Sequence, residues 1–134
     1  MGRLTIGTDG GRIRYMPAAR VAGSISWELE SDPSSVDLRL FWYTVGKGDR
    51  DVGIVDSVTF PHPGLRGRQG FSFELPESPH SFSGRLISLV WALELVVHPS
   101  GETQRLEIIV SPTGREILLY EADGRTDGDS FSNG

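Results

Sequence analysis

The chain has 134 residues, contains no cysteine and carries a formal net charge of −5 at pH 7. This length fits one domain. The lack of cysteine excludes a disulfide framework, a zinc-thiolate site and a cysteine nucleophile, and the negative charge argues against a general affinity for nucleic acid. With 17 glycines, 8 prolines and 37% hydrophobic residues, the composition is typical of an all-β protein with many turns.

No targeting or membrane-spanning segment is visible in the sequence. The first eleven residues contain no apolar stretch followed by a small-residue cleavage site. The longest apolar run, residues 86–97, includes Ser88 and Glu94 and is shorter than the about 20 residues that a transmembrane helix needs. We therefore expect a cytoplasmic protein without a membrane span.

The first half of the chain alternates short strands with turns. Residues 21–30 are the first firm strand, because Val21, Ile25 and Trp27 fall on one face and polar residues on the other. Gly23 in its middle indicates a bulge or a close backbone approach. Further strands are predicted at residues 5–6, 12–15, 36–43 and 52–60, with a tight turn at residues 9–11.

The turn at residues 31–35 predicts that strands 21–30 and 36–43 form a hairpin. If Trp42 faces the core, then Phe41 and Tyr43 lie on the outer face of their strand. Exposed neighbouring aromatic side chains would make a contact patch. The alternative is that both pack under the loop at residues 46–50.

Residues 71–98 organise the rest of the chain as two strands and a corner. Residues 71–75 alternate apolar and polar side chains until Pro76, which has no N–H to donate, ends the strand. Residues 87–97 are apolar on both faces, which predicts a strand in the middle of a sheet. We expect Trp27, Phe73, Leu89 and Trp91 to form the core.

The remaining segments follow from their turn residues and charges. Residues 65–69 are predicted as a basic loop that carries Arg66 and Arg68, and residues 99–102 as a hairpin turn that leads into an antiparallel strand at 105–110. A last strand is expected at 116–120. Residues 1–122 would form a single β-sandwich domain, followed by a polar, disordered tail at 123–134.

No long segment has helical periodicity, so the predicted fold is an all-β, antiparallel sandwich of about seven or eight strands. No internal repeat is present.

The three histidines are the first candidates for chemistry. His62, His80 and His98 each adjoin a proline and would form a metal site only if three loops converged at one end of the sandwich. No ligand-type spacing is present, so surface histidines are the favoured interpretation.

Carboxylates and glycines in the loops give no stronger signal. The aspartates at 49 and 51, and those at 123, 127 and 129, do not fit a calcium-binding loop. Ser83 lacks the leading glycine of a nucleophile elbow, and no glycine-rich stretch has the pattern of a phosphate-binding loop. We predict no catalytic residue, no metal and no cofactor.

Two stretches together resemble arrestin-type domains. One is residues 15–25, YMPAARVAGSI, and the other runs from Phe71 through the FSFELP corner into the strand at 87–97. Ala18 and Ala19 stand where the family has a glycine and an acidic residue. The resemblance implies an immunoglobulin-like β-sandwich that serves as a scaffold or adaptor, as in arrestins, retromer-type cargo proteins and bacterial sporulation-control proteins. Those proteins usually carry two such domains in tandem, and this chain has room for one.

The predicted function is therefore non-catalytic protein binding, through an edge strand or loop ends. The residues expected to contact a partner are Phe41, Tyr43, Arg66, Arg68, His80, Ile117 and Leu119. One version is a homodimer through the edge at 116–120. The alternative is a small-ligand or carbohydrate-binding module that uses Phe41 and Tyr43 as a stacking platform. An enzyme would need a histidine and carboxylates at a shared loop end.

Overall fold

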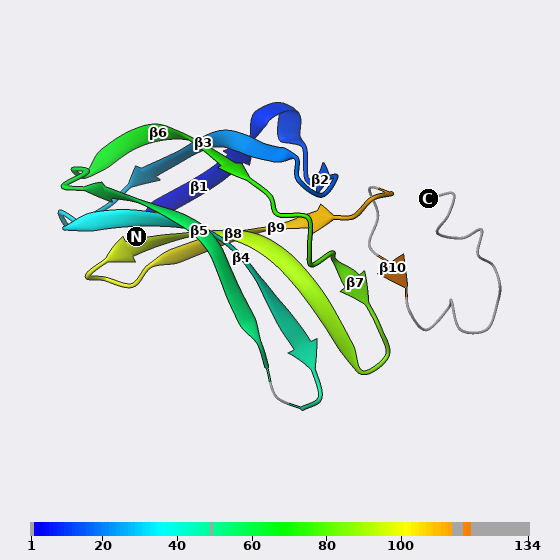
Figure 1. The fold of residues 1–134 in the computed structure, drawn as a ribbon. Helices are drawn as coiled ribbons and strands as arrows, with labels where there is room; N and C mark the ends of the chain where they lie inside the picture. The colour runs from blue at the N-terminus through cyan, green and yellow to red at the C-terminus, as the bar shows by residue number, and fades with distance from the viewer. Residues whose placement is uncertain (1, 49, 114–116, 119–134) are drawn as a thin grey trace.

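The computed structural model describes residues 2–48, 50–113 and 117–118, which form ten strands in two sheets (Figure 1). One sheet has the order β1-β3-β6, and the other has the order β10-β7-β8-β4-β5, with β9 paired to β8 and β2 paired to β9. The strands are β1 (Arg3–Thr8), β2 (Arg14–Tyr15), β3 (Arg20–Glu28), β4 (Ser35–Gly46), β5 (Val52–Pro61), β6 (Arg66–Glu74), β7 (Phe82–Ser83), β8 (Ile87–His98), β9 (Thr103–Val110) and β10 (Ile117–Leu118), with a 3-10 turn at Asp9–Gly11.

The predicted all-β sandwich is confirmed, with a difference in strand direction. Seven of the strands have six residues or more, and β2, β7 and β10 have two each. Six strand pairs are antiparallel, but β2 pairs with β9 and β10 pairs with β7 in parallel. Both exceptions involve two-residue strands that reach an edge from a distant part of the chain, which local alternation does not reveal.

The three-stranded sheet is built around β3, which pairs with β1 and β6 along its length. Val21, Ile25 and Trp27 are buried, as their alternation predicts. Gly23 marks a close backbone approach, because a Cβ atom there would overlap the carbonyl oxygen of Gly7. The register around Gly23 is unbroken, so no bulge is present.

The predicted hairpin between β3 and β4 is wrong. The intervening segment carries the chain from one sheet to the other, and β4 pairs instead with β5 and β8. A turn sequence between two alternating strands fits a hairpin and a crossover between sheets equally well. The partners of β4 are β5 and β8, which come later in the chain, so the turn sequence alone does not predict the pairing.

The larger sheet is built around β8, as its two apolar faces predict. β4 lies along one side of β8, and β7 followed by β9 lies along the other. The corner between β6 and β8 crosses from the small sheet to the large one (Figure 1). Between the sheets, the predicted core residues Trp27, Phe73, Leu89 and Trp91 are all buried in one cluster.

Two further predictions, the basic loop at residues 65–69 and the last strand at 116–120, differ from the structure in their strand boundaries. Arg66 and Arg68 do not sit in a loop, because both belong to β6 and pair with Glu28 and Ser26 of β3. The predicted last strand is described only as Ile117–Leu118, and the predicted tail at 123–134 lies outside the described residues. In the described part of the chain, no helix is long and apolar enough to span a membrane.

Candidate interaction surfaces

The outer face of the large sheet holds the two aromatic residues singled out from the sequence. The register places Trp42 opposite the buried Trp91, so Trp42 faces the core. Phe41 and Tyr43 therefore lie on the opposite, outer side, beside Ala92 and Val90 of β8. Both rings pack against a residue of β9.

That residue is Arg105, whose guanidinium lies over both rings. Its Cζ atom is 5.2 Å from the ring centroid of Phe41 and 4.9 Å from that of Tyr43. Its Nη2 atom donates to Glu94 Oε2 at 3.1 Å, while Tyr43 Oη donates to Glu107 Oε2 at 3.2 Å. These residues from β4, β8 and β9 form what we call the Arg105 cluster.

The cluster favours the charged form of Arg105. Burial on its own would lower the pKa of the guanidinium, but hydrogen bonds and charge interactions with Glu94 and Tyr43 raise it above its ordinary value. A guanidinium that is fully charged and held over two rings is a fixed cation–π contact. Because Phe41 is only 6% exposed, it is not available as a sugar-stacking platform.

Next to the cluster, the sheet presents exposed apolar side chains. Val45, Val52, Ile54 and Leu86 are 45%, 62%, 60% and 68% exposed. Val52 and Ile54 of β5 stand opposite Tyr43 and Phe41, and the end of the sheet that carries them extends beyond the small sheet (Figure 1). We call these four residues the apolar end. Exposed apolar side chains that gather in one region of a surface are candidates for an interaction site.

Positive charges border the apolar end. Lys47 and Arg50 lie in the turn between β4 and β5, and Arg85 directly precedes Leu86. Among the residues that the structure describes, none of these three cations has an ion pair. Asp51 is the described carboxylate in the same turn. Because the same stretch of sequence also contains Asp49, the border combines three cations with two carboxylates.

The edge strand β5 carries two features that oppose pairing with another strand. Its register against β4 shifts between Leu40 and Phe41, which leaves Val55 as an extra, bulged residue. Asp56 follows the bulge at a core-facing register position opposite the buried Leu40, and its exposed carboxylate accepts from the backbone N–H of Ser57 at 2.8 Å. Bulges and inward-facing charges are common protections of edge strands.

The candidate residues Arg66 and Arg68 lie on the other sheet. Their register positions are on the outer face of β6, and Arg68 Nη2 donates to Ser24 Oγ at 3.2 Å. Because Phe41 and Tyr43 lie on the outer face of the large sheet, the sandwich separates the two groups. They cannot form one continuous contact surface.

Two of the three histidines have a side-chain polar contact within the protein. His98 Nε2 lies 3.1 Å from Asp37 Oδ2, and His80 Nε2 lies 3.0 Å from the carbonyl oxygen of Glu77. His62 stands in a turn with a φ of 49°. Within the described ranges, no three metal-ligating side chains come together.

Of the candidates at the last strand, only the backbone of Ile117 is placed. It pairs in parallel with Phe82 of β7, and Leu118 pairs with Ser83. Leu119 lies outside the described residues. The described end of the chain is thus beside β7, which in turn pairs with the start of β8 next to Leu86.

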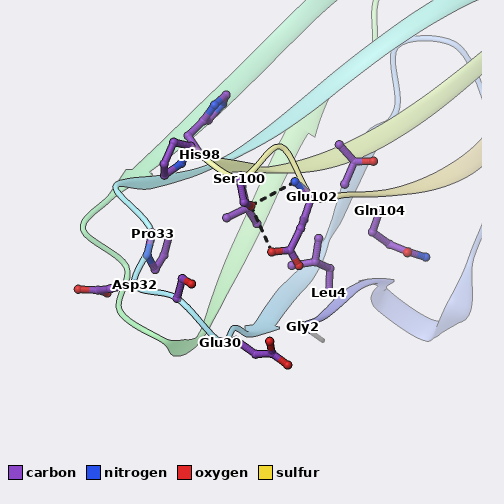
Figure 2. A pocket seen from close by; sticks show the side chains of 13 residues that line it. Gly2, Leu4, Glu30, Asp32, Pro33, His98, Ser100, Glu102 and Gln104 are labelled. Carbon is purple, nitrogen blue, oxygen red and sulfur yellow. Dashed lines mark hydrogen bonds between the residues drawn. The ribbon is translucent and has the colours of Figure 1, made fainter.

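A cavity of about 750 Å³ opens at the opposite end of the sandwich. Figure 2 shows its polar rim, where Ser100 Oγ accepts from the backbone N–H of Glu102 at 3.3 Å and donates to its carboxylate at 3.2 Å. Leu4 and Val97 contribute apolar lining, and Glu30 and Asp32 add acidic groups. Sequence patterns do not indicate this cavity, because its lining comes from three separate segments, residues 2–4, 30–33 and 97–104.

Sequence patterns also missed the Arg105 cluster. A signal existed in the hairpin of β8 and β9, because Glu94 and Arg105 are directly opposed in its register. Opposite charges on facing positions would have suggested a cross-strand pair. The contact with Phe41 required knowledge that β4 lies on the other side of β8.

Comparison with known proteins gives a fold but no close relative. No model of a known protein family matches the chain, and no curated protein matches its sequence. Among solved structures, a β-glucosidase from Listeria innocua in complex with gluconolactone aligns with a TM-score of 0.48 and 10% identity, over 87% of this chain and 16% of the other. The DNA glycosylase AlkC from Pseudomonas fluorescens aligns at 0.43 and 11%, over 82% and 30%. These two scores are too low to support any inference.

The sporulation control protein Spo0M from Bacillus subtilis aligns more closely. The TM-score is 0.57 with 18% identity, over 82% of this chain and 49% of Spo0M. The chain thus spans about half the length of Spo0M. The two-sheet topology and this alignment agree with the resemblance found in the sequence, and the chain has the arrestin-like β-sandwich fold of Spo0M.

Proposed function

We propose that the protein is a non-catalytic protein-binding adaptor that contacts its partner through the apolar end of the large sheet. The supporting observation is the exposure of Val45, Val52 and Ile54 on one outer face of the sheet, with the exposed Leu86 directly before β8. Burying such side chains would stabilise a complex by about 25 cal/mol for each Å² of apolar area. A surface bordered by Lys47, Arg50 and Arg85 favours a partner that combines apolar and acidic residues.

The Arg105 cluster supports the same assignment. It fixes the side chains of Phe41 and Tyr43 beside the apolar end before any partner binds. A contact surface that is already ordered loses less conformational entropy on binding. The buried position of Phe41 disfavours the carbohydrate-binding alternative.

The proposal includes a cytoplasmic location and one β-sandwich domain at residues 1–122. The likeness to Spo0M supports the β-sandwich fold of the proposed adaptor. The adaptor function is inferred from the exposed apolar surface, and the cytoplasmic location from the composition of the chain. Among the partner contacts expected from the sequence, Phe41 and Tyr43 would lie beside the docking surface. Arg66, Arg68 and His80 would belong to a separate contact.

Site-specific photo-crosslinking tests the proposed surface. Benzoylphenylalanine is introduced in place of Ile54 in one variant and of Leu86 in another, and each is irradiated in cells of the source organism. We expect a discrete crosslinked species from both positions, identified by mass spectrometry. The matched control replaces Thr5, which is exposed on the outer face of the small sheet.

Crosslinks from Thr5 as strong as those from Ile54 and Leu86 would contradict the choice of surface. The absence of any crosslinked protein at all three positions would contradict protein binding itself.

A further inference from the structure

We propose that the protein forms a symmetric dimer in which the open edge of β6 pairs antiparallel with β6 of a second copy. Gly70 would lie on the two-fold axis, so that each residue faces the one equally far from Gly70 in the other copy. The pairing would join the two small sheets into one sheet of six strands, three from each copy. This inference goes beyond the proposed function and does not depend on it, because it concerns the other sheet.

The edge of β6 is open and lacks the protections found on β5. Within the described chain, β6 lies at the edge of the small sheet and pairs with β3 alone (Figure 1). Its register against β3 is unbroken from Arg66 to Glu74, and this segment contains no proline. Its core-facing positions carry no charge and are occupied by Gly67, Gln69, Phe71 and Phe73. An unprotected edge of this kind is a template for another strand.

The hydrogen bonds at the two ends of β6 show which backbone groups face the open edge. The N–H of Leu29 donates to the carbonyl oxygen of Leu65 at 2.8 Å. At the other end, the N–H of Leu75 donates to the carbonyl oxygen of Ala19, also at 2.8 Å. Because successive residues of a strand bond to opposite neighbours, the odd-numbered residues of β6 bond to β3 and the even-numbered residues point outward. An axis at Gly70 therefore opposes outward-pointing residues, which can exchange hydrogen bonds.

The charge on the outer face of β6 changes sign from one end of the strand to the other. Arg66 is exposed at the start and Glu74 is exposed at the end, equally far from Gly70. Within one copy the two lie about 27 Å apart along the strand, and neither has an ion pair among the described residues. Across the two-fold axis, Arg66 of each copy stands opposite Glu74 of the other. Facing opposite charges stabilise an antiparallel strand pair.

Neighbouring registers and the other edge of the sheet fit less well. An axis one residue later would place Arg66 opposite Pro76, which has no N–H to donate. An axis one residue earlier would place Glu74 opposite Gly64, which precedes β6. The other edge strand of the small sheet, β1, carries a single cation and no carboxylate, so its charges cannot complement those of a second β1.

The dimer would present both apolar ends on one side. Opposed residues of an antiparallel pair lie on the same face of the sheet, so both large sheets lie on the same side of the joined small sheets. A partner with two binding segments would gain affinity from this arrangement without any new contact.

Charge reversal in the full chain tests the pairing. Light scattering over a concentration series measures the dimer dissociation constant of the unchanged chain, of Arg66→Glu, of Glu74→Arg and of the double variant. We expect each single change to raise this constant at least about tenfold, because it opposes like charges at two places across the axis. The double variant restores opposite charges and should return to within about threefold of the unchanged chain.

The double variant also separates contacts between copies from effects within one copy. In β3, Glu28 faces Arg66 and Arg20 faces Glu74, so the double variant has like charges at both of these intrachain positions. If only intrachain contacts mattered, the double variant would be the most affected chain. Recovery of its dimer would therefore report the contact between copies.

A cysteine on the axis tests the register. The chain has no cysteine, and a Cβ atom at Gly70 would come no closer than 3.7 Å to a neighbouring atom, so Gly70→Cys should fold normally. In a hydrogen-bonded antiparallel pair the two Cα atoms are about 5.5 Å apart, a separation that a disulfide spans. We expect mild oxidation to give a covalent dimer from this variant and none from the control Thr5→Cys, at an exposed position of β1.

A chain that stays monomeric throughout the concentration series would overturn the inference. A dimer that all three charge variants leave unchanged would also overturn it, as would equal rates of oxidation for Gly70→Cys and Thr5→Cys. None of these results bears on the proposed function, whose crosslinking positions Ile54 and Leu86 belong to the apolar end. Conversely, a missing crosslinked partner in cells would remove the adaptor role and leave the dimer intact.

Discussion

The tightest local constraint in the small sheet is the contact at Gly23. This residue faces the core side of β3, where β1 crosses so closely that a Cβ atom would overlap the Gly7 carbonyl oxygen and lie 2.8 Å from the Thr8 Cα. Both contacts are with backbone atoms, which cannot move aside as a flexible side chain would. The absence of a side chain at Gly23 therefore determines how closely the two strands pack.

We expect Gly23→Ala to destabilise the protein by about 1–3 kcal/mol, because β1 must shift to admit the methyl group. The matched control is Gly7→Ala in the neighbouring strand, where nothing lies within 4 Å of the added atom, and its effect should stay within about 0.5 kcal/mol. Urea denaturation monitored by tryptophan fluorescence measures both. A Gly23→Ala variant as stable as Gly7→Ala would show that the close approach is not a constraint.

Arg105 is the residue that joins three strands of the large sheet on its outer face. Its side chain is 43% exposed and that of Glu94 is 16% exposed, so water screens their ion pair in part. We expect a double-mutant cycle between Arg105→Ala and Glu94→Ala to give a coupling energy of about 0.5–1 kcal/mol. The single Arg105→Ala change should cost about 1–2 kcal/mol, since it also removes the contact with two rings.

A cycle between Arg105→Ala and Glu102→Ala serves as the control, because Glu102 interacts with Ser100 instead. A coupling as large for that pair as for Glu94 would mean that the measurement reports general charge, not the specific contact.

At the scale of the element, β5 combines an exposed apolar surface with protection of its edge. Val52 and Ile54 would make the strand prone to pair with other chains, while the bulge at Val55 and the carboxylate of Asp56 interrupt its hydrogen-bonding edge. The geometry thus permits side-chain docking on the face of the strand and disfavours strand addition at its edge.

We expect Asp56→Val to increase self-association, because it removes the inward-facing charge and extends a run of residues with high β-propensity. Light scattering at increasing protein concentration measures the change, with Ser57→Val as the control at the neighbouring position. Ser57 pairs with Arg39 on the outer side of the strand. Unchanged scattering for Asp56→Val would mean that the bulge alone protects the edge.

At the scale of the whole molecule, the two sheets share one core. Trp27 and Phe73 of the small sheet belong to the same buried cluster as Leu89 and Trp91 of the large sheet. Neither sheet can expose its inner face without exposing that of the other. The sandwich should therefore unfold as one cooperative unit.

We expect the unfolding midpoints measured by far-ultraviolet circular dichroism and by tryptophan fluorescence to coincide. The variant Trp27→Phe leaves tryptophans only in the large sheet, and the double variant Trp42→Phe/Trp91→Phe leaves only Trp27 in the small sheet. If the remaining signals change at different denaturant concentrations, then the sheets are separate folding units and the single-core description is wrong.

Much of the fold followed from local patterns. Alternation identified the long strands, the apolar character of both faces placed β8 in the centre, and the prolines and glycines located the turns. The inner position of Trp42 also decided that Phe41 and Tyr43 lie on the outer face. These inferences succeed because side chains in a strand alternate strictly between two faces, so that one assignment determines its neighbours.

The tertiary structure decided what depends on contacts between distant segments. It separated β3 from β4, assigned Arg66 and Arg68 to a strand on the opposite face, and placed Arg105 over the two aromatic rings. Alternation states which side of a strand is buried but not which strand lies beside it. The sequence by itself therefore determined the long strands, the core and the class of fold, whereas the proposed interaction surface depends on β4, β5, β8 and β9 meeting in one sheet.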